Sequence, residues 1–276
     1  MKTTAETAAW PAVQKPLNIT AIKMIAAELM LMDHIHQMFA ADGAPVWLTM
    51  AGRAVFPMFL FAAAESFHYT RSKKKYLLRL LFAGWGMTVF TFMLERAVPN
   101  DHVVLMNNAF TTFFVSGLYM LFWDWFSDGI RKRDAKKTAK AVLCCFLPVL
   151  CALPLFVIAL PSAGGNISAS AVRILVTASM FLPNILMVEG GCAMAALGVL
   201  FYIFREKRAV QMLVLSGLSA LTWAAGGGIQ WLMCLAIIPM ALYNGERGRG
   251  MKHFFYVFYP AHIGILYLLA SLPAPF

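Results

Sequence analysis

LNITAIKMIAAELMLMDHIHQMF, residues 17–39, is the stretch that decides what kind of protein this chain forms. It is long and apolar enough to cross a bilayer, because about 20 helical residues span the roughly 30 Å hydrocarbon layer. It nevertheless carries five ionisable side chains: Lys23, Glu28, Asp33, His34 and His36. A charged side chain near the bilayer centre costs about 2.5–3.5 kcal/mol and is tolerated where it faces protein or a water-filled cavity. The rest of the chain must therefore supply a polar cavity.

The composition indicates a polytopic membrane protein. Of the 276 residues, 61% are hydrophobic and 13% are charged, and the mean hydropathy is +0.70, whereas soluble domains are about 25% charged. We expect an all-α membrane protein whose bundle of about nine or ten transmembrane helices surrounds a polar central cavity, as one integral membrane domain over residues 1–276. The net charge of +10 fits basic cytoplasmic loops better than a nucleic-acid partner. The five cysteines lack metal-ligand spacing to histidine, so we expect no metal.

Apolar runs predict the helices and their breaks. They lie at 17–40, 44–66, 76–94, 107–126, 141–160, 169–188, 190–204, 209–225, 228–242 and 253–271. Pro183–Asn184 and Glu189–Gly190–Gly191 interrupt the sixth and seventh runs, which predicts a broken or re-entrant element there.

Charges in the loops orient the helices. Residues 67–79 and 127–140 are rich in lysine and arginine, which places them in the cytoplasm. Residues 1–16 then form a cytoplasmic tail, and the uncharged 161–168 lies on the opposite side. Nine crossings plus the re-entrant element would also put the basic segments near 205 and 247 in the cytoplasm, and ten crossings remain the alternative.

The first polar cluster combines the first two helices. Asp33 and His34 are about 100° apart on a helix, so they cannot both face one partner squarely. His34 is a candidate general base, and the alternative is a structural polar contact between helices. Arg53 lies at a similar depth in the second helix and needs a carboxylate, for which Asp33 is the nearest candidate. Arg173 is another buried-cation candidate, with Glu189 as its candidate partner.

The second cluster is cationic, and it combines the loop after the second helix with the C-terminal segment. The loop after the second helix holds Arg71, Lys73, Lys74, Lys75 and Arg79. It is either a topology signal or an electropositive mouth for a polyanionic ligand such as a phosphorylated cofactor.

The C-terminal segment adds a glycine-rich turn and an aromatic helix. Arg247 and Lys252 in this region can bind an anion. Tyr256, Tyr259 and His262 follow at three-residue spacing and share one face of the last helix.

Several of these stretches together resemble a known family. They are LysMetIle(x)5LeuMetXMetAspHisIle at 23–35, GlyArgXXPhePro at 52–57, GluSerPheXXThrArgXLysLysLysTyrLeuLeuArgLeu at 65–80 and TyrAsnGly(x)2Gly(x)4LysHisPhePheTyrXPheTyrProXHis at 243–262. The set resembles the TraX family, integral membrane proteins whose plasmid-encoded members N-terminally acetylate conjugative pilin. The chain departs from the family pattern at Ser66, where glycine is expected, and residues 127–242 match by hydropathy alone.

The resemblance implies an acyltransferase in the bacterial inner membrane. Acetyl-CoA would be the cytosolic donor, and the acceptor would be an amine, a peptide or pilin N-terminus among them, or a hydroxyl. His34 would be the base, Asp33 its tuner or the partner of Arg53, Arg53 a donor to the tetrahedral intermediate, and His262 a second site group. The cation cluster would hold the phosphates: Arg71, Lys73, Lys74, Lys75, Arg79, Arg247 and Lys252. The cavity would be lined by Lys23, Glu65, Asn107, Asn108, Tyr243, Asn244, Tyr256 and Tyr259.

Two other functions fit the same residues. A proton-coupled transporter would use Asp33, His34, Glu65 and His262 as a relay through the membrane. A non-catalytic assembly factor would bind another membrane protein. Release of free thiol from acetyl-CoA distinguishes the enzyme from both.

Overall fold

The structure is a computed structural model that describes residues 15–106, 108–159 and 168–272, and only the backbone of Lys252. The predicted tail 1–16 and the loop 161–168 fall almost wholly outside these ranges. Within them, helices and one isolated β-bridge are the regular structure, which confirms the all-α class. The elements are α1 (Ile19–Phe39), α2 (Val46–Gly52), α3 (Val55–His68), α4 (Lys73–Ala97), α5 (Ala109–Lys132), α6 (Ala135–Cys145), α7 (Leu147–Leu150), α8 (Leu153–Ala159), α9 (Ala169–Phe181), α10 (Gly191–Ile203), α11 (Arg208–Ala224), the 3-10 helix η1 (Gly228–Ala236), α12 (Ile237–Ala241) and α13 (Lys252–Ala270).

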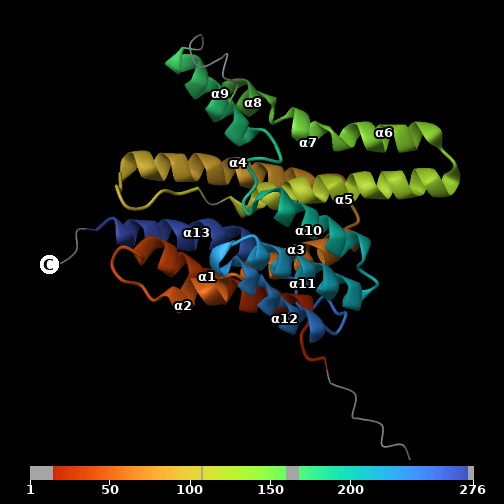
Figure 1. The fold of residues 1–276 in the computed structure, drawn as a ribbon, viewed down its shortest axis with the longest axis horizontal. Coiled ribbons are helices and arrows are strands. Elements are labelled where there is room, and N and C mark those ends of the chain that lie inside the picture. Colours follow the sequence, from red (N-terminus) through yellow and green to blue (C-terminus); the bar gives the residue numbers. More distant parts are fainter. Residues whose placement is uncertain (1–14, 107, 160–167, 273–276) are drawn as a thin grey trace, which may run out of the picture.

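The helices form a compact bundle with an outlying arm (Figure 1). The long helices α4 and α5 lie side by side, and α6 runs back along α5. On the other side of α4 and α5, α13 lies against α1 and α4, and α10 packs between α3 and α5. Helices α7 and α8 continue the arm, and α9 packs against α8 and contacts α4.

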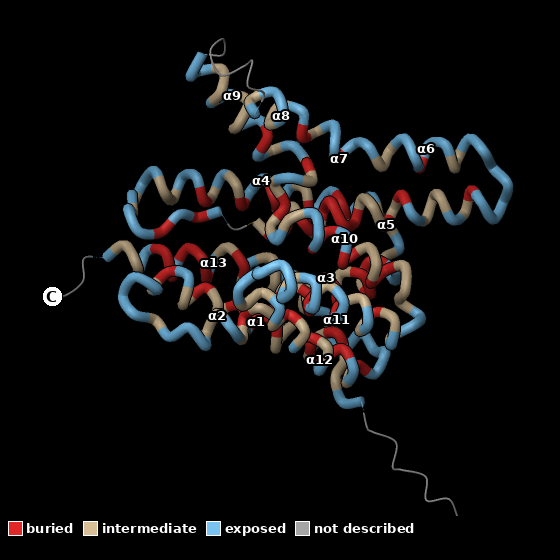
Figure 2. The backbone as a smooth tube through the Cα atoms, in the orientation of Figure 1, coloured by how far each residue is buried: buried red, intermediate tan, exposed pale blue. Residues whose placement is uncertain are grey.

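Helix α3 is the centre of the bundle. Leu60, Phe61 and Ala62 point in three different directions around it, yet all are fully buried. A helix that is apolar and buried all round is surrounded by other helices. Figure 2 shows the contrast with α6, α8 and α9, whose surface is mostly exposed. Exposed apolar side chains on that arm match a lipid-facing surface.

Three helical segments are long and apolar enough to cross a membrane: Val46–His68, Lys73–Ala97 and His253–Ala270. A fourth is obtained if α6–α7 and α8, bent by 44°, count as one span. Helix α1 has the length, but it carries Lys23, Glu28 and Asp33. The polytopic class is therefore confirmed, and nine or ten crossings stay a prediction.

Prolines and glycines explain where the predicted helices break. The expected helix 44–66 is interrupted at Arg53–Ala54, because Pro57 offers no N–H to the carbonyl four residues earlier and its ring crowds that carbonyl. The run 141–160 divides into short helices, with Pro148 near the first break. The sixth run ends at Phe181 and the seventh begins at Gly191, so the predicted interruption at 182–190 is confirmed.

The basic loops gather at one end of the bundle. Lys73, at the start of α4, contacts Asp124 near the end of α5 and Tyr202 near the end of α10. Arg208, at the start of α11, pairs with Glu65 near the end of α3 at 3.3 Å. This grouping is what a common cytoplasmic side requires, and the identity of that side remains a prediction.

Candidate functional site

A cavity of about 1040 Å³ runs between α1, α3, α4, α5, α13 and the segments preceding α10 and α13. Its lining contains Asp33, His34 and Arg53, three of the four predicted catalytic residues. The void expected from the charges in α1 is therefore present.

Cations line one region of the cavity. They are Lys23, Arg71, Lys75, Arg79, Arg247 and Arg249. Four of the predicted phosphate-binding residues belong to this cationic mouth: Arg71, Lys75, Arg79 and Arg247. Lys23 donates to the Ser66 hydroxyl at 3.1 Å, so the serine that replaces the expected glycine positions a cavity cation.

Two predicted phosphate-binding lysines do not reach the cavity. Lys73 is held by Asp124 and Tyr202, and its ammonium lies over the Phe67 ring. Lys74 is exposed on the next helical position and is outside the lining. The periodicity of α4 turns successive side chains by about 100°, so adjacent lysines cannot share one face. The prediction is wrong for these two, and the side chain of Lys252 is outside the described part of the structure. Arg249, which was not predicted, takes part instead.

The turn that carries Arg247 and Arg249 is fixed to the start of α1. The Asn244 N–H donates to the Leu17 carbonyl at 2.8 Å, and the Thr20 hydroxyl donates to the carbonyl of Arg249 at 2.6 Å. Asn244 itself bonds Glu246 through its side chain. Asn244 is thus a turn residue and does not line the cavity, contrary to prediction.

The first polar cluster of the sequence analysis centres on His34. His34 Nδ1 lies 2.6 Å from His262 Nε2, and His262 Nδ1 lies 2.7 Å from the Phe258 carbonyl. A carbonyl only accepts, so His262 donates from Nδ1, and in the neutral pair its Nε2 accepts the proton of His34 Nδ1. The lone pair of His34 is then on Nε2. His262 is buried and lies outside the cavity lining, so it contacts His34 and not the cavity.

Asp33 forms the predicted clamp with Arg53. The Arg53 guanidinium donates to Asp33 Oδ1 at 2.5 Å, and the Thr49 hydroxyl donates to the same oxygen at 2.6 Å. Arg53 also donates to the Thr49 carbonyl and to Gln230. The geometry favours the clamp over the alternative, in which Asp33 tunes His34, because Asp33 Oδ1 accepts from both Arg53 and Thr49.

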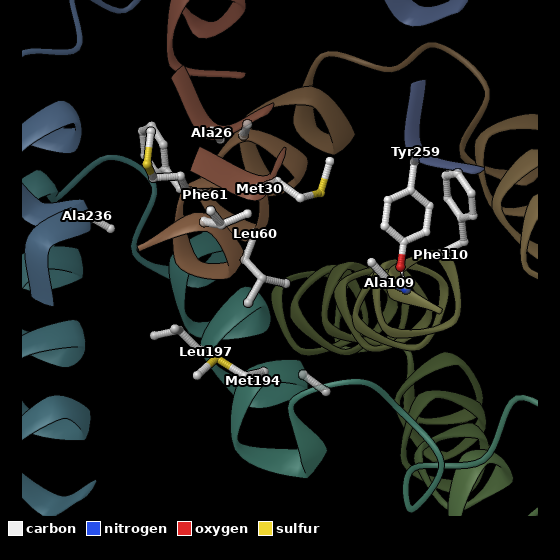
Figure 3. Packing of buried hydrophobic residues seen from close by; sticks show 14 of the residues in the cluster. Ala26, Met30, Leu60, Phe61, Ala109, Phe110, Met194, Leu197, Ala236 and Tyr259 are labelled. Atoms are coloured by element: carbon white, nitrogen blue, oxygen red, sulfur yellow. Dashed lines mark hydrogen bonds between the residues drawn. The ribbon is translucent and has the colours of Figure 1, made fainter. Parts of the chain in front are cut away.

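Glu189 is the cavity residue whose role the sequence did not show. It lies near the end of the irregular segment 182–190, and Tyr259 donates to its Oε2 at 3.2 Å. Figure 3 shows the Tyr259 hydroxyl directed at Ala109 and beside Phe110; the Ala109 N–H donates to that hydroxyl at 3.0 Å. The contacts of Glu189 run to α5 and α13, so Arg173 is not its partner as proposed from the sequence.

The other predicted cavity residues divide into lining and supporting positions. Glu65, Tyr243, Tyr256 and Tyr259 line the cavity. Asn108 instead donates to the Gly84 carbonyl at 3.0 Å and to Thr88, which ties α5 to α4. Asn107 lies outside the described residues.

The arrangement is suited to acid–base chemistry beside a polyanion site. In the ranges that the structure covers, no three His, Cys, Asp or Glu side chains gather as a metal site would require. A histidine in a fixed tautomer can accept a proton, and an arginine can stabilise an oxyanion.

Comparison with known proteins identifies the family. A family model described as TraX protein matches residues 18–270, so the chain belongs to the TraX family. A probable fimbrial assembly protein FimC, serogroup H1, of Dichelobacter nodosus is 39% identical over 67 residues, which is 23% of this chain and 27% of that protein. The matched part is thus about a quarter of the length of that curated relative. No solved structure matches the chain.

Proposed function

We propose that this member of the TraX family is a membrane-embedded acetyltransferase that moves an acetyl group from cytosolic acetyl-CoA to an amine or hydroxyl acceptor. The observation that carries the proposal is the shared cavity, which joins a cationic mouth to the His34 base. Acetyl-CoA has a polyanionic nucleotide at one end and a thioester at the other. The nucleotide would bind at the cationic mouth, and the thioester would lie beside His34.

Aromatic side chains provide an apolar path between the two regions. The Lys23 ammonium lies 6.0 Å from the centroid of the Phe255 ring, and Phe255 contacts Phe59 edge-on at 6.3 Å. Phe59 contacts Phe113, which stacks on Phe56. All four phenylalanines line the cavity. Such a wall suits the gem-dimethyl and methylene groups of the pantetheine arm of a CoA thioester.

His34 would act through Nε2, the atom that the His262 contact leaves as the basic nitrogen. It would take the proton from the acceptor as the acceptor attacks the thioester carbonyl. The Arg53 guanidinium would donate to the oxyanion of the tetrahedral intermediate. Direct transfer and an acetyl-histidine relay both remain compatible with this geometry.

The relatives support a pilin-like acceptor. Plasmid-encoded TraX proteins act on conjugative pilin, and the D. nodosus relative is named as a probable fimbrial assembly protein. We therefore favour a pilin-like peptide N-terminus in the bacterial inner membrane. The fimbrial relative also supports the second candidate, an assembly factor without catalysis. The transporter is less favoured because Asp33 and Glu65 are held in ion pairs.

Thiol release tests the proposal. Purified protein should release free CoA thiol from acetyl-CoA when a peptide with a free N-terminus is present, and His34→Ala should abolish the release. The matched control is His102→Ala, because His102 is exposed and outside the cavity lining. Unchanged release by His34→Ala would exclude that residue, and no release by the unmodified protein would favour the assembly factor.

A further inference from the structure

Glu189 differs from the other carboxylates of the cavity. Three carboxylates line it: Asp33, Glu65 and Glu189. Asp33 pairs with Arg53 at 2.5 Å, and Glu65 pairs with Arg208 at 3.3 Å. None of the ion pairs between residues that the structure describes involves Glu189. A carboxylate at such a site needs a cation to offset its desolvation.

The backbone and neighbouring residues hold Glu189 in place. Its carbonyl accepts a hydrogen bond from the Thr112 hydroxyl at 3.0 Å. Gly190 and Gly191 follow with φ of +77° and +71°, a conformation that side chains rarely adopt. A Cβ at Gly190 would collide with Met194. The backbone of Glu189 is therefore fixed relative to α5 and α10.

Tyr259 connects Glu189 to the base. The Ala109 N–H occupies a lone pair of the Tyr259 hydroxyl, so the hydroxyl proton is directed to Glu189. The Tyr259 and His34 rings have centroids 6.4 Å apart. Tyr259 thus places Glu189 on the His34 side of the cavity. The cavity cations that form no ion pair among the described residues lie in the mouth.

We propose that Glu189 binds the ammonium group of the acceptor and thereby selects amines over hydroxyls. The inference rests on the proposed acetyl transfer and assigns to one residue the recognition of the acceptor amine favoured there. An acceptor ammonium at Glu189 would carry the charge opposite to that of the acetyl-CoA phosphates, which the proposal places at the cationic mouth. A neutral hydroxyl acceptor would leave the Glu189 charge without a partner.

The transfer balances with two protons leaving the acceptor nitrogen. The ammonium loses one proton to solvent by way of Glu189, which produces the nucleophilic amine. A C–N bond forms to the acetyl carbon and the C–S bond breaks. His34 accepts the second proton from the nitrogen and delivers it to the departing CoA sulfur. The products are an acetamide, CoA thiol and one proton.

The test compares two peptides and two variants. One peptide begins with alanine, and the other is identical except that lactic acid replaces the alanine, so that a hydroxyl replaces the ammonium. The unmodified protein should acetylate the alanine peptide and discriminate against the lactyl peptide. Glu189→Gln keeps the shape and should raise the KM for the alanine peptide about ten- to a hundredfold, the range of one charge-assisted hydrogen bond. Its binding of acetyl-CoA should not change, which also shows that it folds. Asp101→Asn, an exposed carboxylate outside the lining, is the matched control.

Two results would overturn the inference while leaving acetyl transfer intact. They are a KM for the alanine peptide within twofold of normal in Glu189→Gln, and equal use of both peptides by the unmodified protein. Acetylation of neither peptide would instead refute the proposed function, and this inference with it.

Discussion

Breaking the Asp33–Arg53 clamp should destabilise the bundle measurably. Removing one partner of a buried ion pair costs about 3–5 kcal/mol where the other charge is left unpaired. Here the two side chains retain 21% and 27% exposure toward the cavity. Arg53 also keeps Thr49 and Gln230 as partners. We therefore expect Asp33→Asn to lower the free energy of unfolding by about 2 kcal/mol, below that range.

A double-mutant cycle separates the pair from its surroundings. Arg53→Gln alone leaves Asp33 with the Thr49 hydroxyl, and we expect a similar loss of about 2 kcal/mol. Combining both substitutions should cost less than the sum, with a coupling of about 1–2 kcal/mol, because neither charge is then left alone. The measurement is reversible unfolding in mixed micelles with increasing denaturing detergent, followed by circular dichroism.

Additive losses would refute the reasoning. If the two single variants sum to the double variant within about 0.5 kcal/mol, the contact contributes no pairwise energy. If Asp33→Asn left the free energy of unfolding unchanged, Arg53 would need no carboxylate at this depth. Asp101→Asn, which changes an exposed carboxylate, controls for effects of net charge on detergent binding.

Three further predictions concern the mouth, the histidine pair and the glycine-rich turn. Arg79→Gln should raise the Kd for acetyl-CoA several-fold, more at low salt than at high salt, while Lys74→Gln should leave it unchanged; calorimetric titration measures both. His262→Phe should lower kcat at least tenfold with little change in the KM for acetyl-CoA, because the ring no longer fixes the tautomer of the base; steady-state kinetics would contradict this if KM alone changed. Gly248→Ala should destabilise the turn by about 1–2 kcal/mol, because Gly248 has φ of +70° and no room for a Cβ. Gly250→Ala meets open space and should be neutral in the same unfolding assay.

The sequence predicted the helices well because the bilayer imposes a simple length and polarity rule. Apolar runs located α1, α4, α10 and α13 within a few residues of their observed bounds. The break at Arg53 was missed, because its cause, Pro57, lies four positions further along the chain.

The site was only partly predictable. The Asp33–Arg53 pair was predicted because both residues lie at a similar depth in consecutive helices, and that depth can be read from the sequence. His34 and His262 were both expected in the site, but their direct contact depends on how α13 packs against α1. Lys73 was assigned to the mouth because charge counts do not show which face of α4 is turned inward. Glu189 was assigned to Arg173 instead of Tyr259, because an irregular segment brings it to Tyr259 and no helical period predicts that approach.

Isotope transfer to a defined peptide tests the central claim most directly. The protein is incubated with acetyl-CoA labelled in the acetyl carbons and a peptide with a free N-terminus, and the peptide is fragmented by mass spectrometry. We predict label on the terminal nitrogen with the unmodified protein and with His102→Ala, and none with His34→Ala. Equal labelling by His34→Ala, or no labelling by the unmodified protein while it binds acetyl-CoA, would contradict the account.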